Sequence, residues 1–293
     1  MRAGRMLALW AVVAVASPAG VAAAPARPGA AKPAERRKTA AERKREEAEA
    51  RALAALEAEL SSGDAGRLRA ALESAPVREL PPERVSPLVA ASARRGAPPE
   101  LLVTMARVLG ELRQESASPV LAALARHRNA EVRRSALRAL ARTRGAAAVA
   151  ALRLALRGSD RDARGLAATG LGELGAAEAT ADLSRALDLE VTEAALALGR
   201  VCRGEGCGEL LGRLGRVPLG TLGPGLHAAL LRTGDALPPE RALEWISKLR
   251  EVGTPEVGRL LAGVARAWPE GAHPPVRQAL EEAARANGAE VDE

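Results

Sequence analysis

A pattern that repeats through the middle of the chain limits its possible folds most strongly. Three stretches, 98–112, 129–143 and 160–174, align without gaps at a spacing of 31 residues, and a fourth at 188–201 follows after a deletion. The recurring columns hold Leu109, Leu140, Leu171 and Leu198, then Gly110, Ala141, Gly172 and Gly199, with Val108, Ala139, Gly170 and Ala197 before the leucines. A shorter amphipathic segment precedes the later stretches. A fixed period with two helices per unit predicts an all-α fold, an α-solenoid of antiparallel helix pairs.

Glycines in the third stretch follow from the same repeat. A glycine inside a helix costs about 1 kcal/mol relative to alanine. Gly170 and Gly172 fall in columns of mostly small residues, where close packing of neighbouring helices offsets that cost. Gly175 and Gly145 are expected to end the second helices of their units. Gly165 has no counterpart in its column, and the sequence offers no reason for it.

The third stretch resembles the short HEAT-like repeat of the phycobilin-lyase type, D-x-x-(V/A)-R-x-x-A-x-x-(A/G)-L-(A/G)-x-L-G. The matching residues are Asp160, Ala163, Arg164, Ala167, Leu171, Gly172, Leu174 and Gly175, and in the preceding unit Asn129, Val132, Arg133, Ala136, Ala139 and Leu140. The resemblance covers about 98–203. It implies a HEAT- or armadillo-like superhelix and indicates almost nothing about activity.

In that family the aspartate at the turn and the arginine that opens the second helix form a ladder between repeats. The resemblance therefore implies a structural role for Asp160, Arg133 and Arg164. Leu102 and Thr192 replace the arginine in the outer units, so a partial ladder is expected. A lyase activity is not expected, since an exported chain would not meet the lyase substrate.

The first 24 residues read as a secretory signal peptide. A basic start is followed by eleven apolar residues, Met6 to Ala16, and then by small residues that fit cleavage after Ala23. A bilayer span needs roughly 20 apolar residues, so no stable span is expected after cleavage. An uncleaved anchor is the alternative. The sequence thus predicts an exported bacterial protein, periplasmic or secreted.

The remaining chain divides by composition and spacing. Proline followed by an acid marks several helix starts, and helices are expected near 64–74, 82–94, 239–251, 255–267 and 275–286. Eight glycines in 204–225 predict an irregular joint between two stacks. The expected segments are a signal peptide (1–24), a charged linker and lead-in helix (25–62), a repeat array (63–203), the joint (204–225), C-terminal helical repeats (226–288) and a tail (289–293).

The net charge of +7 gives little support for nucleic-acid binding. Most of it lies before residue 52, and residues 52–293 carry only +1. Phe and Tyr are absent, so few aromatic rings are present on which bases could stack. Nucleic acid is therefore not an expected partner.

Known catalytic and metal-binding patterns are also missing. The three histidines, His127, His227 and His273, lie in no His-Glu or His-x₃-His arrangement. No G-x-S-x-G or phosphate-loop motif occurs. The sequence predicts no catalytic residues, no metal and no cofactor.

Cys202 and Cys207 lie in a glycine-rich stretch just after a repeat helix. In an oxidising compartment such a pair is expected to form a disulfide. A metal or redox site is the alternative, but a metal would need ligands from distant segments.

A local excess of arginine gives the sharpest functional hypothesis. Residues 126–164 hold eleven arginines and three acids, whereas 165–210 hold three arginines and eight acids. Arg134, Arg138 and Arg142 recur every four residues on one predicted helix face, and Arg107 extends the band one unit earlier. A solvated face neutralised by Glu111, Glu131 and Glu173 is the alternative.

The favoured interpretation is a non-enzymatic scaffold that binds a protein or peptide, with an acidic protein segment or an anionic envelope polymer on the arginine band. A lyase-like enzyme and a structural spacer of the cell envelope remain alternatives. The sequence does not indicate the oligomeric state.

Overall fold

The computed structural model describes residues 39–74 and 76–290. The helical array from Lys44 onward forms one compact unit. The α-helices are α1 (Ala40–Ser61), α2 (Ala65–Glu73), α3 (Pro76–Glu79), α4 (Pro82–Arg95), α5 (Pro99–Leu112), α6 (Ser118–Leu124), α7 (Ala130–Thr143), α8 (Ala146–Leu156), α9 (Arg161–Leu174), α10 (Thr180–Asp188), α11 (Glu193–Val201), α12 (Gly208–Leu211), α13 (Leu219–Leu230), α14 (Pro239–Val252), α15 (Pro255–Arg266) and α16 (Pro274–Ala286). Within the described ranges no β-strand occurs, which confirms the all-α class.

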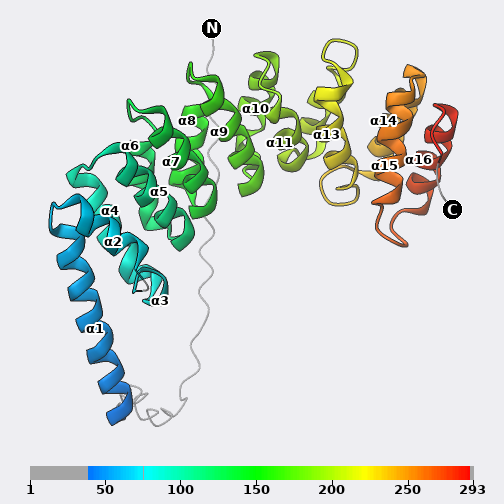
Figure 1. Cartoon of the computed structure of the whole chain (residues 1–293). Helices are drawn as coiled ribbons and strands as arrows, with labels where there is room; N and C mark the ends of the chain where they lie inside the picture. Colours follow the sequence, from blue (N-terminus) through cyan, green and yellow to red (C-terminus); the bar gives the residue numbers. More distant parts are fainter. Residues whose placement is uncertain (1–38, 75, 291–293) are drawn as a thin grey trace, which may run out of the picture. The chain divides into compact units, whose positions relative to one another are not determined.

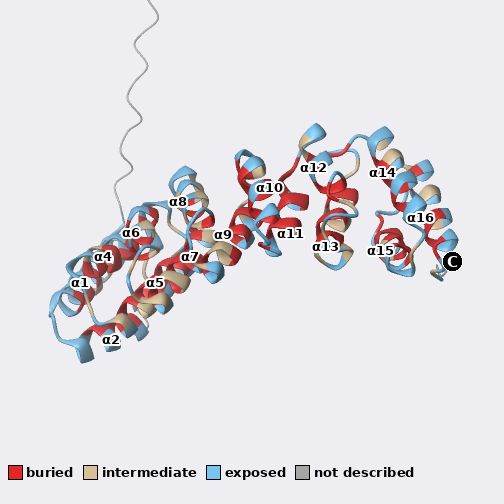
Figure 2. Cartoon of the chain, turned by 90° about the horizontal axis from the view of Figure 1, so that it is seen from above, coloured by how far each residue is buried: buried red, intermediate tan, exposed pale blue. Residues whose placement is uncertain are grey.

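From α4 to α15 the helices form successive pairs, and each pair packs on the next (Figure 1). The second helices, α5, α7, α9, α11, α13 and α15, form one row with extensive contacts between neighbours. The first helices form the other row, in which contacts between neighbours are sparser. Buried residues lie mainly between the two rows (Figure 2). The fold is therefore an α-solenoid.

Helix boundaries follow the sequence signals closely. The five expected helices at the two ends of the array match α2, α4, α14, α15 and α16 within one residue at each end. The Asn129 and Asp160 side chains cap α7 and α9 by accepting backbone N–H groups, as expected of N-cap residues. Leu53, Leu56 and Leu60 of the lead-in helix α1 are buried.

Small residues bring the second helices into close contact. A Cβ atom on Gly110 would lie 2.9 Å from the Cα atom of Ala139 in the next unit, and a Cβ on Gly172 would lie 2.9 Å from the Cα of Ala197. The glycine columns therefore have the packing role that the repeat predicts. At Gly165 a Cβ atom would meet only the end of the flexible Glu193 side chain, so this contact does not require glycine.

The two glycines expected at helix ends differ in position. Gly175 is the C-cap of α9 in the left-handed conformation, with φ of +66°. At the end of α7 the C-cap is Arg144, and Gly145 precedes α8 as its N-cap. Both glycines therefore lie at the end of a second helix with positive φ, Gly175 as the C-cap and Gly145 directly after the C-cap.

The segment 204–225 contains a short 3-10 turn at 204–207, the four-residue helix α12 and, from Leu219 onward, the first part of α13. Residues 44–293 form one compact unit, and α11 packs directly on α13 across the glycine-rich segment. The contact requires glycine on both helices, because a Cβ on Gly199 would overlap the carbonyl group of Gly225. One of the glycines that suggested a joint, Gly225, therefore forms another close contact between second helices.

Candidate interaction surfaces

The predicted arginine band is only partly available to a partner. Arg107 pairs with Glu111 at 2.7 Å. Arg134 pairs with Asp162 at 2.5 Å and lies 3.7 Å from Glu131. These two arginines are therefore neutralised within the protein, largely by the neighbours that the alternative interpretation proposed.

Arg138 and Arg142 form the available part of the band. Both are exposed on α7, and no ion pair joins either of them to another described residue. They lie four residues apart, so their side chains are neighbours on the helix surface. We call this pair the α7 arginine surface.

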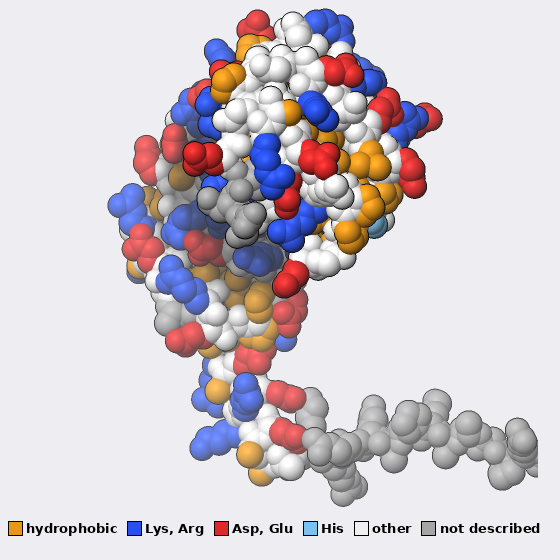
Figure 3. All heavy atoms as spheres, turned by 90° about the vertical axis from the view of Figure 1, so that its right-hand side faces the viewer, with side chains coloured by type: hydrophobic (Ala, Val, Ile, Leu, Met, Phe, Trp, Pro, Cys, Tyr) orange, Lys and Arg blue, Asp and Glu red, His pale blue; other side chains and the backbone are white. Residues whose placement is uncertain are grey.

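The same segment contains further unpaired cations. Within the part of the chain that the structure describes, no ion pair involves seven of the eleven arginines in 126–164: Arg126, Arg128, Arg138, Arg142, Arg144, Arg161 and Arg164. By contrast, the face shown in Figure 3, viewed from the C-terminal side of Figure 1, carries interspersed cationic and anionic side chains. Residues 126–164 are thus a distinctly cationic part of the array.

The ladder implied by the family resemblance contains one of its expected pairs. Arg133 donates to Asp160 at 2.5 Å and also to the carbonyl oxygens of His127 and Arg128. This hydrogen bond from Arg133 is the main reason that the pKa of Asp160 lies below its ordinary value. Arg164 has no acidic partner among the described residues, and its Nε atom is buried without a hydrogen bond. The expected ladder therefore does not continue beyond Asp160.

Two other ion-pair networks join the first helices, and the sequence did not point to them. Asp182 of α10, whose side chain is only 3% exposed, accepts hydrogen bonds from Arg153 and Arg157 of α8, each at 2.6 Å. Arg213, 9% exposed, donates two hydrogen bonds to the Asp188 carboxylate and others to Ser184 and Glu209. Apart from the Glu209–Arg213 pair, the partners lie 25–29 residues apart, so no local motif marks the contacts between helices. We assign both networks to stability.

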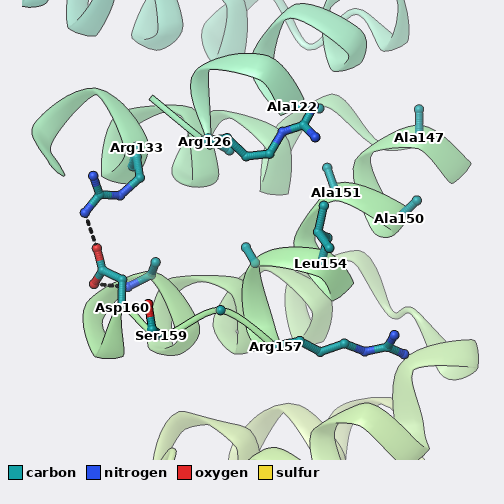
Figure 4. Close-up of a pocket in the computed structure, with 14 residues that line it drawn as sticks. Ala122, Arg126, Arg133, Ala147, Ala150, Ala151, Leu154, Arg157, Ser159 and Asp160 are labelled. Atoms are coloured by element: carbon teal, nitrogen blue, oxygen red, sulfur yellow. Dashed lines mark hydrogen bonds and ion pairs between the residues drawn. The ribbon is translucent and has the colours of Figure 1, made fainter. Parts of the chain in front are cut away.

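A groove opens between α6 and α8. Its volume is about 900 Å³, and half of its lining is alanine: Ala122, Ala125, Ala147, Ala150, Ala151, Ala155 and Ala163. Leu154 of α8 also lines it, with 55% of its surface exposed. We call this site the α6–α8 groove (Figure 4). Leu154 and the alanines together form a small apolar surface inside the groove.

The charged groups of the groove are mainly cationic. Arg126, Arg133 and Arg157 line it together with a single acid, Asp160. Asp160 is bound to Arg133, and Arg157 is bound to Asp182, which lies outside the lining. Arg126 is exposed without an ion pair to any described residue, and its side chain extends from the end of α6 toward α8 (Figure 4).

The sequence contains a signal for this groove outside the repeated columns. Ala148, Leu152 and Leu156 recur every four residues and form the buried face of α8. Leu154 lies two residues from Leu152, about 200° around the helix axis, and so is outside that face. A leucine out of phase with the core marks an exposed apolar position.

Cys202 and Cys207 form a disulfide in the structure, and both are buried. The bonded loop follows α11. Arg232 binds it from a later turn by donating to the carbonyl oxygens of Gly199 and Cys202, each at 3.1 Å. The cysteines therefore belong to the packed body of the array.

Two further observations concern other classes of site. Across residues 39–74 and 76–290, no three His, Cys, Asp or Glu residues gather as a metal site would require. In the same residues, no helix is both long and apolar enough to cross a bilayer.

Comparison with protein families supports the repeat assignment. Residues 86–162 match the family model of HEAT repeats. The matched region runs from α4 into α9 and thus includes α7 and the α6–α8 groove. A comparison with curated proteins finds no match. Together with the helix pairs of the structure, the match supports an α-solenoid in which residues 86–162 are similar to HEAT repeats.

Proposed function

We propose that the protein is a non-enzymatic scaffold outside the cytoplasm that binds an acidic segment of another protein. The observation that carries the proposal is the α7 arginine surface. Arg138 and Arg142 carry like charges at a spacing where they repel each other slightly, and neither forms an ion pair with a described residue. Packing gives no reason for this arrangement, whereas an acidic partner would.

HEAT-like repeats are consistent with this role. Solenoids present an extended surface to which each unit contributes, and such surfaces suit protein ligands. The apolar run at residues 6–16 supports a location in the periplasm or outside the cell. Because charge dominates the proposed contact, its affinity falls as salt rises.

Capture from envelope extract tests the proposal. We compare the mature wild-type chain, the double variant Arg138→Glu/Arg142→Glu and the control Arg259→Glu/Arg266→Glu. The control residues are also exposed on one helix without an ion pair to a described residue. We expect the wild type and the control to capture a stoichiometric partner, which salt releases. The α7 variant should capture no such partner. All three should match in helicity and melting temperature.

Equal capture by the α7 variant would overturn the proposal for this surface. Failure of the wild-type chain to retain any stoichiometric protein would favour the alternative of a structural spacer. The two failures are distinguishable, since the first leaves a captured partner and the second does not.

A further inference from the structure

We propose that the α6–α8 groove binds the apolar side chains of an acidic, amphipathic segment from another protein. The proposal deepens the scaffold function and rests on it, because it adds an apolar contact to the charge-based one. The groove and the α7 arginine surface are separate sites: Arg133 is the α7 residue that lines the groove, and Arg138 and Arg142 do not line it.

The floor of the groove suits incoming apolar groups. Alanine has no rotamer freedom to lose when a ligand covers it, and its small size lets a partner backbone approach closely. Leu154 lies exposed beside these alanines. Burial of its side chain by a ligand would therefore contribute the most favourable free energy of any lining residue. The volume of about 900 Å³ is large enough for several side chains of a peptide.

Charge determines which apolar segment fits. Of the three arginines that line the groove, Arg133 and Arg157 are paired with Asp160 and Asp182, and Arg126 has no ion pair to a described residue, so the groove retains one unpaired cation. A carboxylate of the ligand would pair with the Arg126 guanidinium while neighbouring leucine-like side chains cover Leu154 and Ala151. An acidic amphipathic segment supplies both groups at helical spacing.

The N-terminal segment of this chain is a poor occupant. Residues 25–38 contain five basic residues and one acidic residue. Such a segment would bring cations to a cationic groove. The same argument favours a ligand of opposite charge from another protein.

Synthetic peptides test the inference directly. The probe is a fluorescein-labelled peptide with leucine and glutamate at helical spacing, and fluorescence anisotropy measures its binding to the mature chain. Two matched peptides replace every glutamate by glutamine or every leucine by serine. We expect the probe to bind in a salt-sensitive manner and each replacement to weaken binding at least about 10-fold.

Variants of the protein locate the contact. Leu154→Asp and Arg126→Ala are each expected to weaken probe binding about 10-fold. The matched controls are Leu189→Asp, at a leucine that is 60% exposed outside the groove, and Arg266→Ala. Both controls should bind like the wild type. Since all four positions are exposed, each variant is expected to fold.

Three results would overturn the inference. If Arg138→Glu/Arg142→Glu abolishes probe binding and Leu154→Asp does not, the groove is not the binding site. The scaffold proposal would then still stand. Absence of probe binding to the wild type would contradict the groove alone, since capture from extract is measured independently. A dimer in sedimentation that Leu154→Asp disrupts and Leu189→Asp does not would show that a second copy covers the groove.

Discussion

The carbonyl group of Gly225 occupies the space that a β-carbon on Gly199 would need. The two glycines join α11 to α13 across a segment whose composition suggests a break. Backbone rather than a side chain lies in the way, so the contact has no flexible group that could move aside.

Gly199→Ala is therefore expected to destabilise the protein by about 2 kcal/mol, with steric strain exceeding the gain in helix propensity. The control is Gly263→Ala in α15, where a Cβ atom would meet only His227, 3.9 Å away. That change should stabilise the protein by about 0.5–1 kcal/mol. Urea unfolding followed by circular dichroism measures both. Similar effects of the two substitutions would contradict the close contact.

The disulfide is expected to contribute about 2 kcal/mol, at the low end of the usual range because its loop is short. Cys202→Ala/Cys207→Ala should lower the urea midpoint accordingly. The wild-type chain, exported and then denatured without reductant, should show no thiol that reacts with an alkylating agent. Alkylation of both cysteines under these conditions would rule out the bond in the exported protein.

The Asp182 network makes stability depend on pH. Burial alone would raise the pKa of Asp182, but hydrogen bonds from Arg157 and Arg153 outweigh it, so the pKa lies below the ordinary value of 3.8. The unfolded chain then binds this proton more readily than the folded one. The contribution to stability is present above about pH 4 and is lost as pH falls through the lower folded value.

Asp182→Asn is the variant that tests this pH dependence. Between pH 7 and pH 3 it should lose less unfolding free energy than the wild type does. The control is Asp235→Asn, which removes an exposed carboxylate whose ion pairs span 3.7–3.8 Å. This control should respond to pH like the wild type. If the unfolding free energy of Asp182→Asn falls with pH as much as that of the wild type, the network does not cause the loss of stability at acid pH.

Export is expected to remove about the first 23 residues. The apolar run of eleven residues is too short to remain as a stable span. N-terminal sequencing of the protein recovered outside the cytoplasm should begin near Ala24. Recovery of Met1 on that material would contradict cleavage.

Local and periodic signals account for most of what the sequence predicts correctly. The leucine and small-residue columns identify the second helices, and proline-acid pairs place helix starts within one residue. The glycine-rich stretch is ambiguous, because composition does not distinguish a flexible glycine from one buried against a neighbouring helix. Only the approach of Gly225 to Gly199 resolves that ambiguity.

The candidate surfaces were predictable only in part. Helical spacing places Arg138 and Arg142 together, but it does not show that Asp162 binds Arg134 from the next unit. The groove escaped prediction because it forms between α6 and α8, from residues separated by about one repeat. Contacts at that separation depend on how successive units pack, which a periodic pattern does not specify.

Packing of each helix pair on its neighbours has a consequence for cooperativity. In such an array the coupling between units is nearly one-dimensional, so the loss of one interface weakens the adjacent pairs first. Opening of the terminal helices requires fewer interfaces to break than opening of the middle. The units between α6 and α9 are flanked on both sides, and they can keep their binding surfaces in register while the ends of the array fray.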